Sequence, residues 1–169
     1  MSELIEQATY LQDEAQALAY VIDDIPYDEQ PAGGRSIRDW LILIDANQML
    51  RFKPLTDAVT KGSNKPLNLK ELSEEQLVDR YDAEDKNLPI HELLQKIAKH
   101  RGSILAGLER MSGYDLERDV EVRGGKQQPL QTCIEQLIEQ ERDMLKQIAS
   151  IVKDLQTESD RNRSLKSGG

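Results

Sequence analysis

Four segments of this 169-residue chain repeat apolar residues three and four positions apart, the spacing that aligns them on one face of an α-helix. They span residues 4–22, 36–50, 90–111 and 129–155. Since amphipathic helices bury their apolar faces against one another, the pattern predicts an all-α four-helix bundle. Aromatic residues make up only 4% of the chain, which argues against β-sandwiches and barrels.

Charge and cysteine content exclude several classes of function. The net charge of −9 and the isoelectric point near 4.8 disfavour binding to a nucleic-acid backbone. Cys133 is the single cysteine, so no disulfide framework or cysteine-rich zinc site is expected. Neither a secretory leader nor an apolar run of membrane-spanning length is evident, and we expect a cytoplasmic protein without a membrane partner.

Prolines, glycines and polar runs divide the chain. We expect one domain over residues 1–155, with a long crossover over 54–88 between the second and third helices, and an irregular polar tail over 156–169. Ser36 and Ser73 have capping-box spacing to Asp39 and Gln76, which predicts helix starts at both serines. The charged run 82–86 favours turns, and Gly124-Gly125 marks a turn in a linker over residues 114–128.

Polar residues that interrupt the apolar faces are the candidates for a site, because bundles place ligands between their helices. Glu141 occupies a position where the fourth helix would otherwise carry an aliphatic residue, and Gln140 lies beside it. Asp45 and Asn47 follow the apolar run of the second helix.

Each candidate also has a purely structural interpretation. Glu141 can pair with Arg101 across the bundle, and this interpretation is favoured because structural ion pairs are common. Asp45 and Asn47 can lie on a solvated face. His91 is expected to be exposed and His100 to be a surface or hydrogen-bonded residue, and the sequence predicts Cys133 to be a small core residue. The rest of the sequence contains no standard metal-binding or phosphate-binding motif.

Three stretches resemble the DinB-like (YfiT-like) superfamily of four-helix bundles. Residues 36–41 resemble the opening of that family's second helix. His100 to Gly113, continued to Gly125, resembles the end of the third helix and the following linker with its short extended piece. Residues 130–148 resemble the last helix. The resemblance implies the bundle fold over about residues 3–155.

The same resemblance implies a divalent metal bound by one histidine on the second helix and an HxxxH pair on the fourth, with thiol-dependent transfer or isomerisation in some members. The aligned positions are Leu43, Gln140 and Met144. If the alignment is shifted by one residue, the aligned positions include Ile44, Glu141 or Asp143, and none of these is a histidine. The only two histidines both lie in the third helix, so we predict neither a metal site, nor a cofactor, nor catalytic residues of the family type.

Two functions follow as hypotheses. The first is a bundle that has lost the family's metal and serves as a binding or interaction module for a small molecule or a second copy of itself, with Val21 and Leu105 as spare apolar residues. The alternative is an enzyme of the thiol-dependent S-transferase or hydrolase type that uses carboxylates and amides instead. The candidate pocket comprises Leu43, Asp45, Gln140, Glu141 and Met144.

Overall fold

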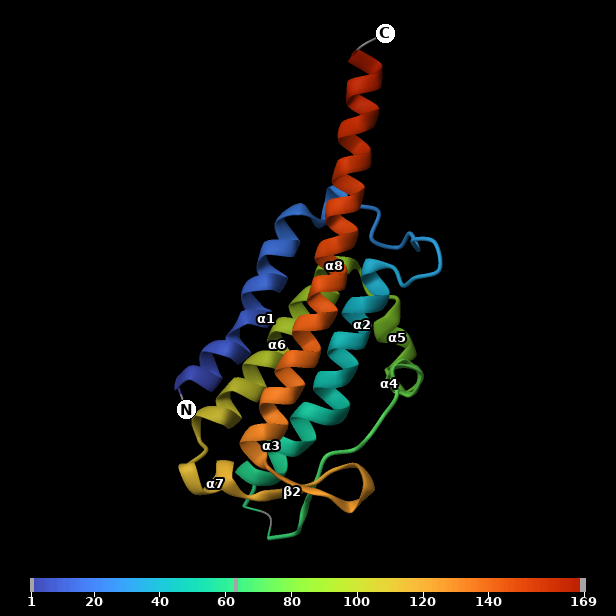
Figure 1. Ribbon diagram of the computed structural model, residues 1–169. Helices are drawn as coiled ribbons and strands as arrows, with labels where there is room; N and C mark the ends of the chain where they lie inside the picture. Colours follow the sequence, from blue (N-terminus) through green and yellow to red (C-terminus); the bar gives the residue numbers. More distant parts are fainter. Residues whose placement is uncertain (1, 63, 168–169) are drawn as a thin grey trace.

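The computed structural model describes residues 2–62 and 64–167, which form four long helical rods with a small sheet at one end (Figure 1). Residues 1, 63, 168 and 169, which belong to the predicted domain, crossover and tail, lie outside the described residues. The all-α bundle predicted from periodicity is confirmed. The rods are α1 (Ser2–Val21), α2 (Ile37–Asn47) with its continuation, α6 (Ile90–Glu109) and α8 (Leu130–Ser167).

The second rod is longer than its sequence pattern predicts. The prediction that this helix ends near Leu50 is wrong, because α2 continues through a π-helical turn, η2 (Gln48–Phe52), into α3 (Lys53–Thr60). Pro54 lies in the first turn of α3, directly after this π-helical turn.

Side-chain caps start two helices where the sequence predicts them. Ser36 Oγ accepts a hydrogen bond from the Asp39 N–H, and the Asp39 carboxylate accepts one from the Ser36 N–H, at 3.1 and 3.0 Å. Ser73 and Gln76 form the same reciprocal pair at the start of α4 (Glu74–Arg80). The two capping boxes therefore define the start of the second rod and of the helix in the crossover.

The crossover contains more helix than expected. The charged run 82–86 was predicted to form turns, but it forms α5 (Ala83–Lys86), because Asp82 Oδ1 accepts a hydrogen bond from the Glu84 N–H at 2.8 Å and caps the short helix. A short 3-10 turn, η1 (Ile22–Asp24), ends the first rod.

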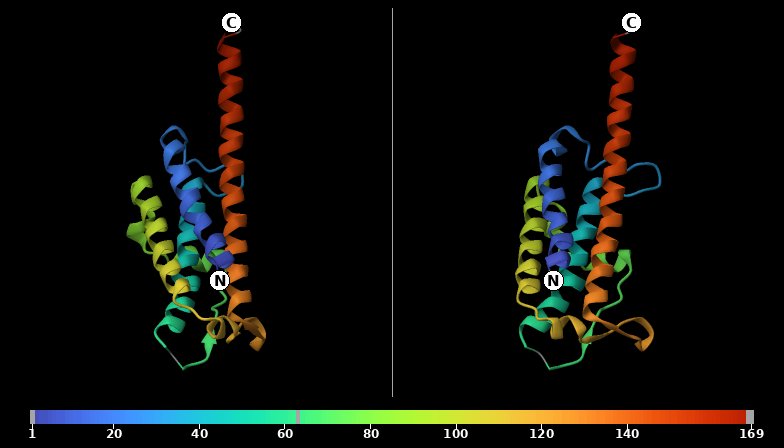
Figure 2. Two further views of the ribbon diagram at one scale, coloured as in Figure 1. Left: turned by 90° about the vertical axis from the view of Figure 1, so that its left-hand side faces the viewer. Right: turned by 60° about the vertical axis from the view of Figure 1, so that its left-hand side comes forward.

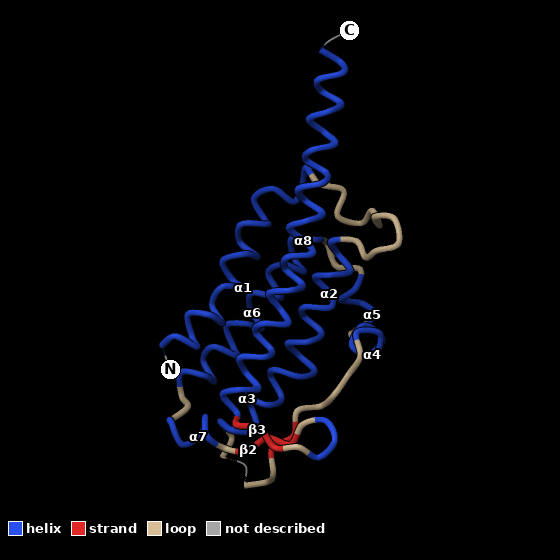
Figure 3. Tube along the Cα trace, viewed as in Figure 1, coloured by secondary structure: helices blue, strands red, loops and turns tan. Residues whose placement is uncertain are grey.

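A three-stranded sheet closes one end of the bundle (Figure 3). It joins the crossover to the linker before α8, since β1 (Leu67–Asn68) pairs in parallel with β2 (Asp119–Glu121), and β2 pairs antiparallel with β3 (Gln127–Pro129). Gly124 and Gly125, at φ +74°, make the turn of this hairpin within η3 (Arg123–Gly125), and α7 (Gly113–Glu117) precedes it. The expected extended piece of the linker is therefore a strand pair.

The core consists of two apolar clusters separated along the bundle axis. The first contains Leu43 and Ile97, and the second contains Phe52 and Ile104. On the second rod, α6 and α8, buried or half-buried polar residues fall between the members of the two clusters. We call this set the polar layer; it comprises Asp45, Gln48, His100, Arg101 and Glu141.

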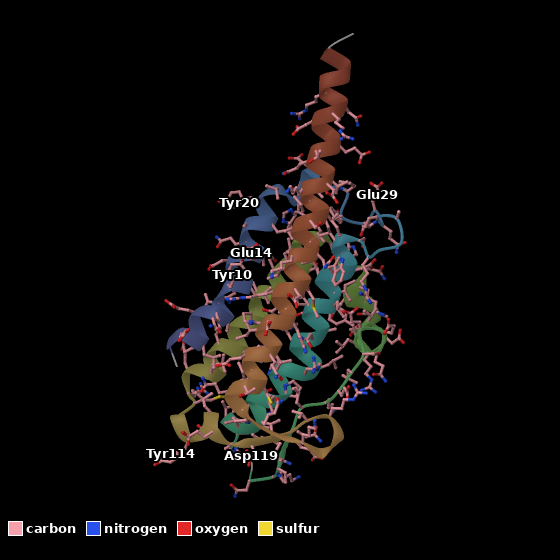
Figure 4. All side chains as sticks on the ribbon, viewed as in Figure 1. Tyr10, Glu14, Tyr20, Glu29, Tyr114 and Asp119 are labelled. Carbon is pink, nitrogen blue, oxygen red and sulfur yellow. The ribbon has the colours of Figure 1, made fainter. Side chains whose placement is uncertain are left out.

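Helix α8 extends well past the other three rods (Figures 1 and 2). The expectation of an irregular tail after residue 155 is wrong within the described residues, because the chain continues as one helix to Ser167. None of the described helices combines the length and the apolar character needed to cross a membrane. The two most exposed tyrosines, Tyr20 and Tyr114, lie at opposite ends of the four-rod bundle, below the extension of α8 (Figure 4).

Candidate functional site

A groove lies between the second rod, α8 and the segment that leads into α4. Its volume of about 510 Å³ falls in the range of about 300–1,000 Å³ that is usual for small-molecule sites. We call it the α2–α8 groove. Its lining includes the polar residues Asn47, Arg51 and Gln140. It also includes the apolar residues Trp40, Leu77 and Met144.

Arg51 forms hydrogen bonds to all three walls of the groove at its polar end. Its Nη1 donates to Oδ1 of Asn47 at 3.1 Å and to Oε1 of Gln140 at 2.8 Å, so the guanidinium joins the second rod to α8. Its Nε donates to the Lys70 carbonyl at 3.1 Å. The guanidinium therefore also binds the segment that leads into α4, which is the third wall of the groove. Burial lowers the pKa of Arg51 from its usual value, and Glu71 opposes that shift.

Asn47 holds a donor without a partner. The residue is 1% exposed, and its Nδ2 atom is buried with no acceptor among the residues that the structure describes. The amide cannot gain by flipping, because its oxygen already accepts from Arg51. A buried N–H without an acceptor costs free energy, so this part of the groove is prepared for an additional acceptor.

Asp45 lies behind the groove in the polar layer and is fully buried. Its Oδ2 accepts a hydrogen bond from the Tyr81 hydroxyl at 2.5 Å. Its Oδ1 accepts from Gln48 Nε2 at 3.1 Å and lies 2.7 Å from His100 Nδ1. Three polar partners therefore satisfy this carboxylate, and the interpretation of Asp45 as a residue on a solvated face is wrong.

Arg101 and Glu141 form the other half of the polar layer. Arg101 is fully buried; it donates to Glu141 Oε2, to Gln48 Oε1 at 2.8 Å and to the Ala8 carbonyl at 3.1 Å, and its guanidinium lies over Phe52. Desolvation raises the pKa of Glu141 to about 7, against the opposing effect of Arg101. Desolvation also lowers the pKa of Arg101. The structural interpretation of Glu141 as the partner of Arg101 is confirmed.

The structure separates the five residues of the predicted pocket. Gln140 and Met144 line the α2–α8 groove, whereas Leu43, Asp45 and Glu141 are buried in the bundle interior. The residue of the second rod that lies with Gln140 and Met144 is Asn47, one helical turn beyond Leu43. Asn47 is therefore a groove residue and not a residue of a solvated face.

Sequence reasoning missed Arg51, Gln48 and Tyr81. The spacing of four residues between Asn47 and Arg51 was a usable signal, because it places both on one helix face. Nothing local identifies Tyr81, whose partner Asp45 is 36 residues away in the chain.

The remaining candidates have structural roles. His91 is largely exposed and lies 2.7 Å from Asp23, as expected for a residue of the first helical turn. Cys133 is fully buried in the second cluster, and burial raises the pKa of its thiol, so its prediction as a core residue is confirmed. Among the described residues, no group of three histidine, cysteine, aspartate or glutamate side chains is arranged to hold a metal ion.

A second, apolar groove lies between α1 and α8. Its volume is about 260 Å³, and its lining includes Leu18, Val21 and Val152. Val21 is 42% exposed, whereas Leu105 is half-buried against the second cluster. Of the two spare apolar residues named from the sequence, Val21 is therefore the one on an open apolar surface.

Comparison with known proteins supports the fold. No family model matches the chain, and no curated protein matches it in sequence. Among solved structures it is similar to YfiT from Bacillus subtilis, described as a probable metal-dependent hydrolase with an unusual four-helix bundle topology. The TM-score is 0.72 at 12% sequence identity, over 91% of this chain and 86% of that one. This similarity confirms the YfiT-like four-helix bundle.

Proposed function

We propose that this chain is a YfiT-like bundle that binds a small carboxylate-bearing molecule in the α2–α8 groove without a metal ion. One observation carries the proposal: the Arg51 guanidinium bridges Asn47 and Gln140. The superfamily resemblance implies a bound cation held by one residue of the second helix and an i, i+4 pair of the fourth. In this chain the Arg51 guanidinium is the cation in the groove, bonded to Asn47 of the second rod and to Gln140 of α8.

The residues present do not fit a divalent metal. Asn47 and Gln140 offer neutral amides that are already bonded to Arg51, and Met144 offers a thioether. Glu71, Glu74 and Asp143 also line the groove, but among the described residues no three such side chains are grouped so that they could hold a metal ion. Hard cations require several oxygen ligands, and zinc requires imidazole, thiolate or carboxylate donors. The guanidinium adds a positive charge that repels a second cation. We therefore derive no chemistry from a metal in this groove.

The donors of the groove favour an anionic acceptor. Arg51 uses Nε and Nη1 in its bonds to the described residues, which leaves Nη2 without an acceptor among them. The orphaned Nδ2 of Asn47 belongs to the amide whose oxygen Arg51 contacts. A carboxylate presents two acceptor oxygens, which is the complement of two neighbouring donors.

The alternative of an enzyme with a carboxylate and amide site has less support. It requires Asp45 and Glu141 to act with Gln140, but both carboxylates are buried and bonded within the polar layer. Neither residue lines the α2–α8 groove. A general base must reach its substrate, so a binding module accounts better for this arrangement.

Calorimetric titration with 4-methylpentanoate, a carboxylate with a branched hydrocarbon tail, tests the proposal. We expect saturable binding to the native protein. Arg51→Met should weaken it about tenfold or more, because the charge-assisted hydrogen bond is lost. The matched control is Arg142→Met, since Arg142 lies over Tyr10 outside the groove. Absence of binding, or equal binding by Arg51→Met and the native protein, would contradict the proposal.

A further inference from the structure

The α2–α8 groove carries negative as well as positive charge. Three carboxylates line it, from Glu71, Glu74 and Asp143, against the single cation Arg51. An incoming carboxylate is attracted by Arg51 and repelled by these three carboxylates. A ligand with both a carboxylate and an ammonium group satisfies both signs of charge.

Glu71 is the carboxylate best placed beside the cation. The carbonyl of Lys70, its neighbour in the chain, accepts a hydrogen bond from Arg51 Nε at 3.1 Å. The negative charge of Glu71 also opposes the lowering of the Arg51 pKa by burial, as expected for a carboxylate close to the guanidinium. The other partner of Glu71 is Arg123, at 3.3 Å, in a pair whose side chains are 54% and 84% exposed. Such exposed pairs are weak, so Glu71 can bind an ammonium group at little cost.

The other two carboxylates are less suited to this role. Glu74 is bound by Arg35 at 2.5 Å. Asp143 pairs with Lys146 at 3.9 Å, and unlike Glu71 it is not among the charges that shift the pKa of Arg51. Arg51 and Glu71 therefore supply opposite charges from two walls of one groove, as a ligand with both a carboxylate and an ammonium group requires.

Part of the groove lining is apolar. The half-buried Trp40 and the buried Leu77 and Met144 come from the three walls of the groove. Burying a hydrocarbon or thioether side chain against them is favourable in proportion to the area covered.

We infer that the α2–α8 groove binds an α-amino acid with an apolar side chain, its carboxylate on Arg51 and Asn47 Nδ2 and its ammonium group on Glu71. This inference rests on the proposed function and specifies its ligand class. The buried donor of Asn47, which the described residues leave without an acceptor, supports this placement of the carboxylate.

Three matched probes test the inference by calorimetric titration of the full chain. They are L-leucine, 4-methylpentanoate, which lacks the amine, and 3-methylbutylamine, which lacks the carboxylate. We expect leucine to bind about tenfold or more tightly than either half-probe, because each lacks one charge-assisted contact. Glu71→Gln should remove the advantage of leucine over 4-methylpentanoate while leaving 4-methylpentanoate binding intact. Glu75→Gln, an exposed change in α4, is the control.

The outcomes separate the two proposals. If 4-methylpentanoate binds as tightly as leucine, or if Glu71→Gln leaves the preference unchanged, the amino-acid inference is wrong and the carboxylate site stands. If neither compound binds, the proposed function fails and the inference fails with it. Circular dichroism of each variant verifies that the bundle is folded before binding is compared.

Discussion

Replacing Glu141 by glutamine should change how stability depends on pH. Glutamine has nearly the same shape and keeps an oxygen for the Arg101 guanidinium, but it cannot ionise. In the native protein Glu141 is 3% exposed, and its pKa is raised to about 7 from 4.5. Between these two pH values the folded state binds more protons at this site than the unfolded chain, so the free energy of unfolding falls as the pH rises.

The magnitude follows from the size of the shift. A change from 4.5 to about 7, at about 1.4 kcal/mol per pKa unit, corresponds to about 3 kcal/mol. The native protein therefore loses about 3 kcal/mol from this group as the pH rises from below 4.5 to above 7. Glu141→Gln lacks this loss, so its stability relative to the native protein should rise by about 3 kcal/mol over the same interval.

Urea unfolding at intervals from pH 4 to pH 8.5, followed by circular dichroism, measures the difference. Glu139→Gln, an exposed change on the same helix, controls for the loss of one negative charge from an acidic protein. A variant whose relative stability stays constant, or falls as the pH rises, would refute the reasoning. Such a result would show that Arg101 outweighs desolvation and keeps the carboxylate ionised.

Three further predictions follow. Asn47→His, Gln140→His and Met144→His combined should create a site for Zn²⁺ or Ni²⁺, measurable by elemental analysis, because all three positions line the α2–α8 groove. The same combination with Leu43→His in place of Asn47→His should not, because Leu43 does not line the groove. Stoichiometric metal in the purified native protein would contradict its metal-free character. Tyr81→Phe should cost about 1–3 kcal/mol in urea unfolding by removing a buried donor to Asp45, and no measurable loss would refute that role. Light scattering should detect a dimer that Val21→Glu abolishes, and a native monomer at every concentration would overturn this prediction.

Much of the fold could be predicted because its signals are local. Apolar residues three and four apart identify the rods, and the serine caps at Ser36 and Ser73 are complete within four residues. The pairing of Glu141 with Arg101 was also accessible, since a lone carboxylate on an apolar face requires a cation opposite it. The sequence therefore predicts the bundle and part of its polar interior.

The rest depends on contacts distant in sequence. Pro54 indicates a break unless the π-helical turn before it is known, and that turn has no clear sequence signature. The groove requires Arg51 to meet Gln140, 89 residues further along the chain, together with a wall from the crossover. Family alignment placed Leu43 at the site, yet one turn of helix separates it from Asn47, which is the residue in the groove.

The length of α8 affects how this molecule moves through solution. At about 1.5 Å per residue, its 38 residues extend about 57 Å, whereas the 20 residues of α1 or α6 extend about 30 Å. The elongated outline in Figure 2 gives a larger hydrodynamic radius than a sphere of 19.2 kDa would have. A monomer will therefore leave a gel-filtration column earlier than a compact protein of the same mass. Its mass must be measured by a method that does not depend on shape.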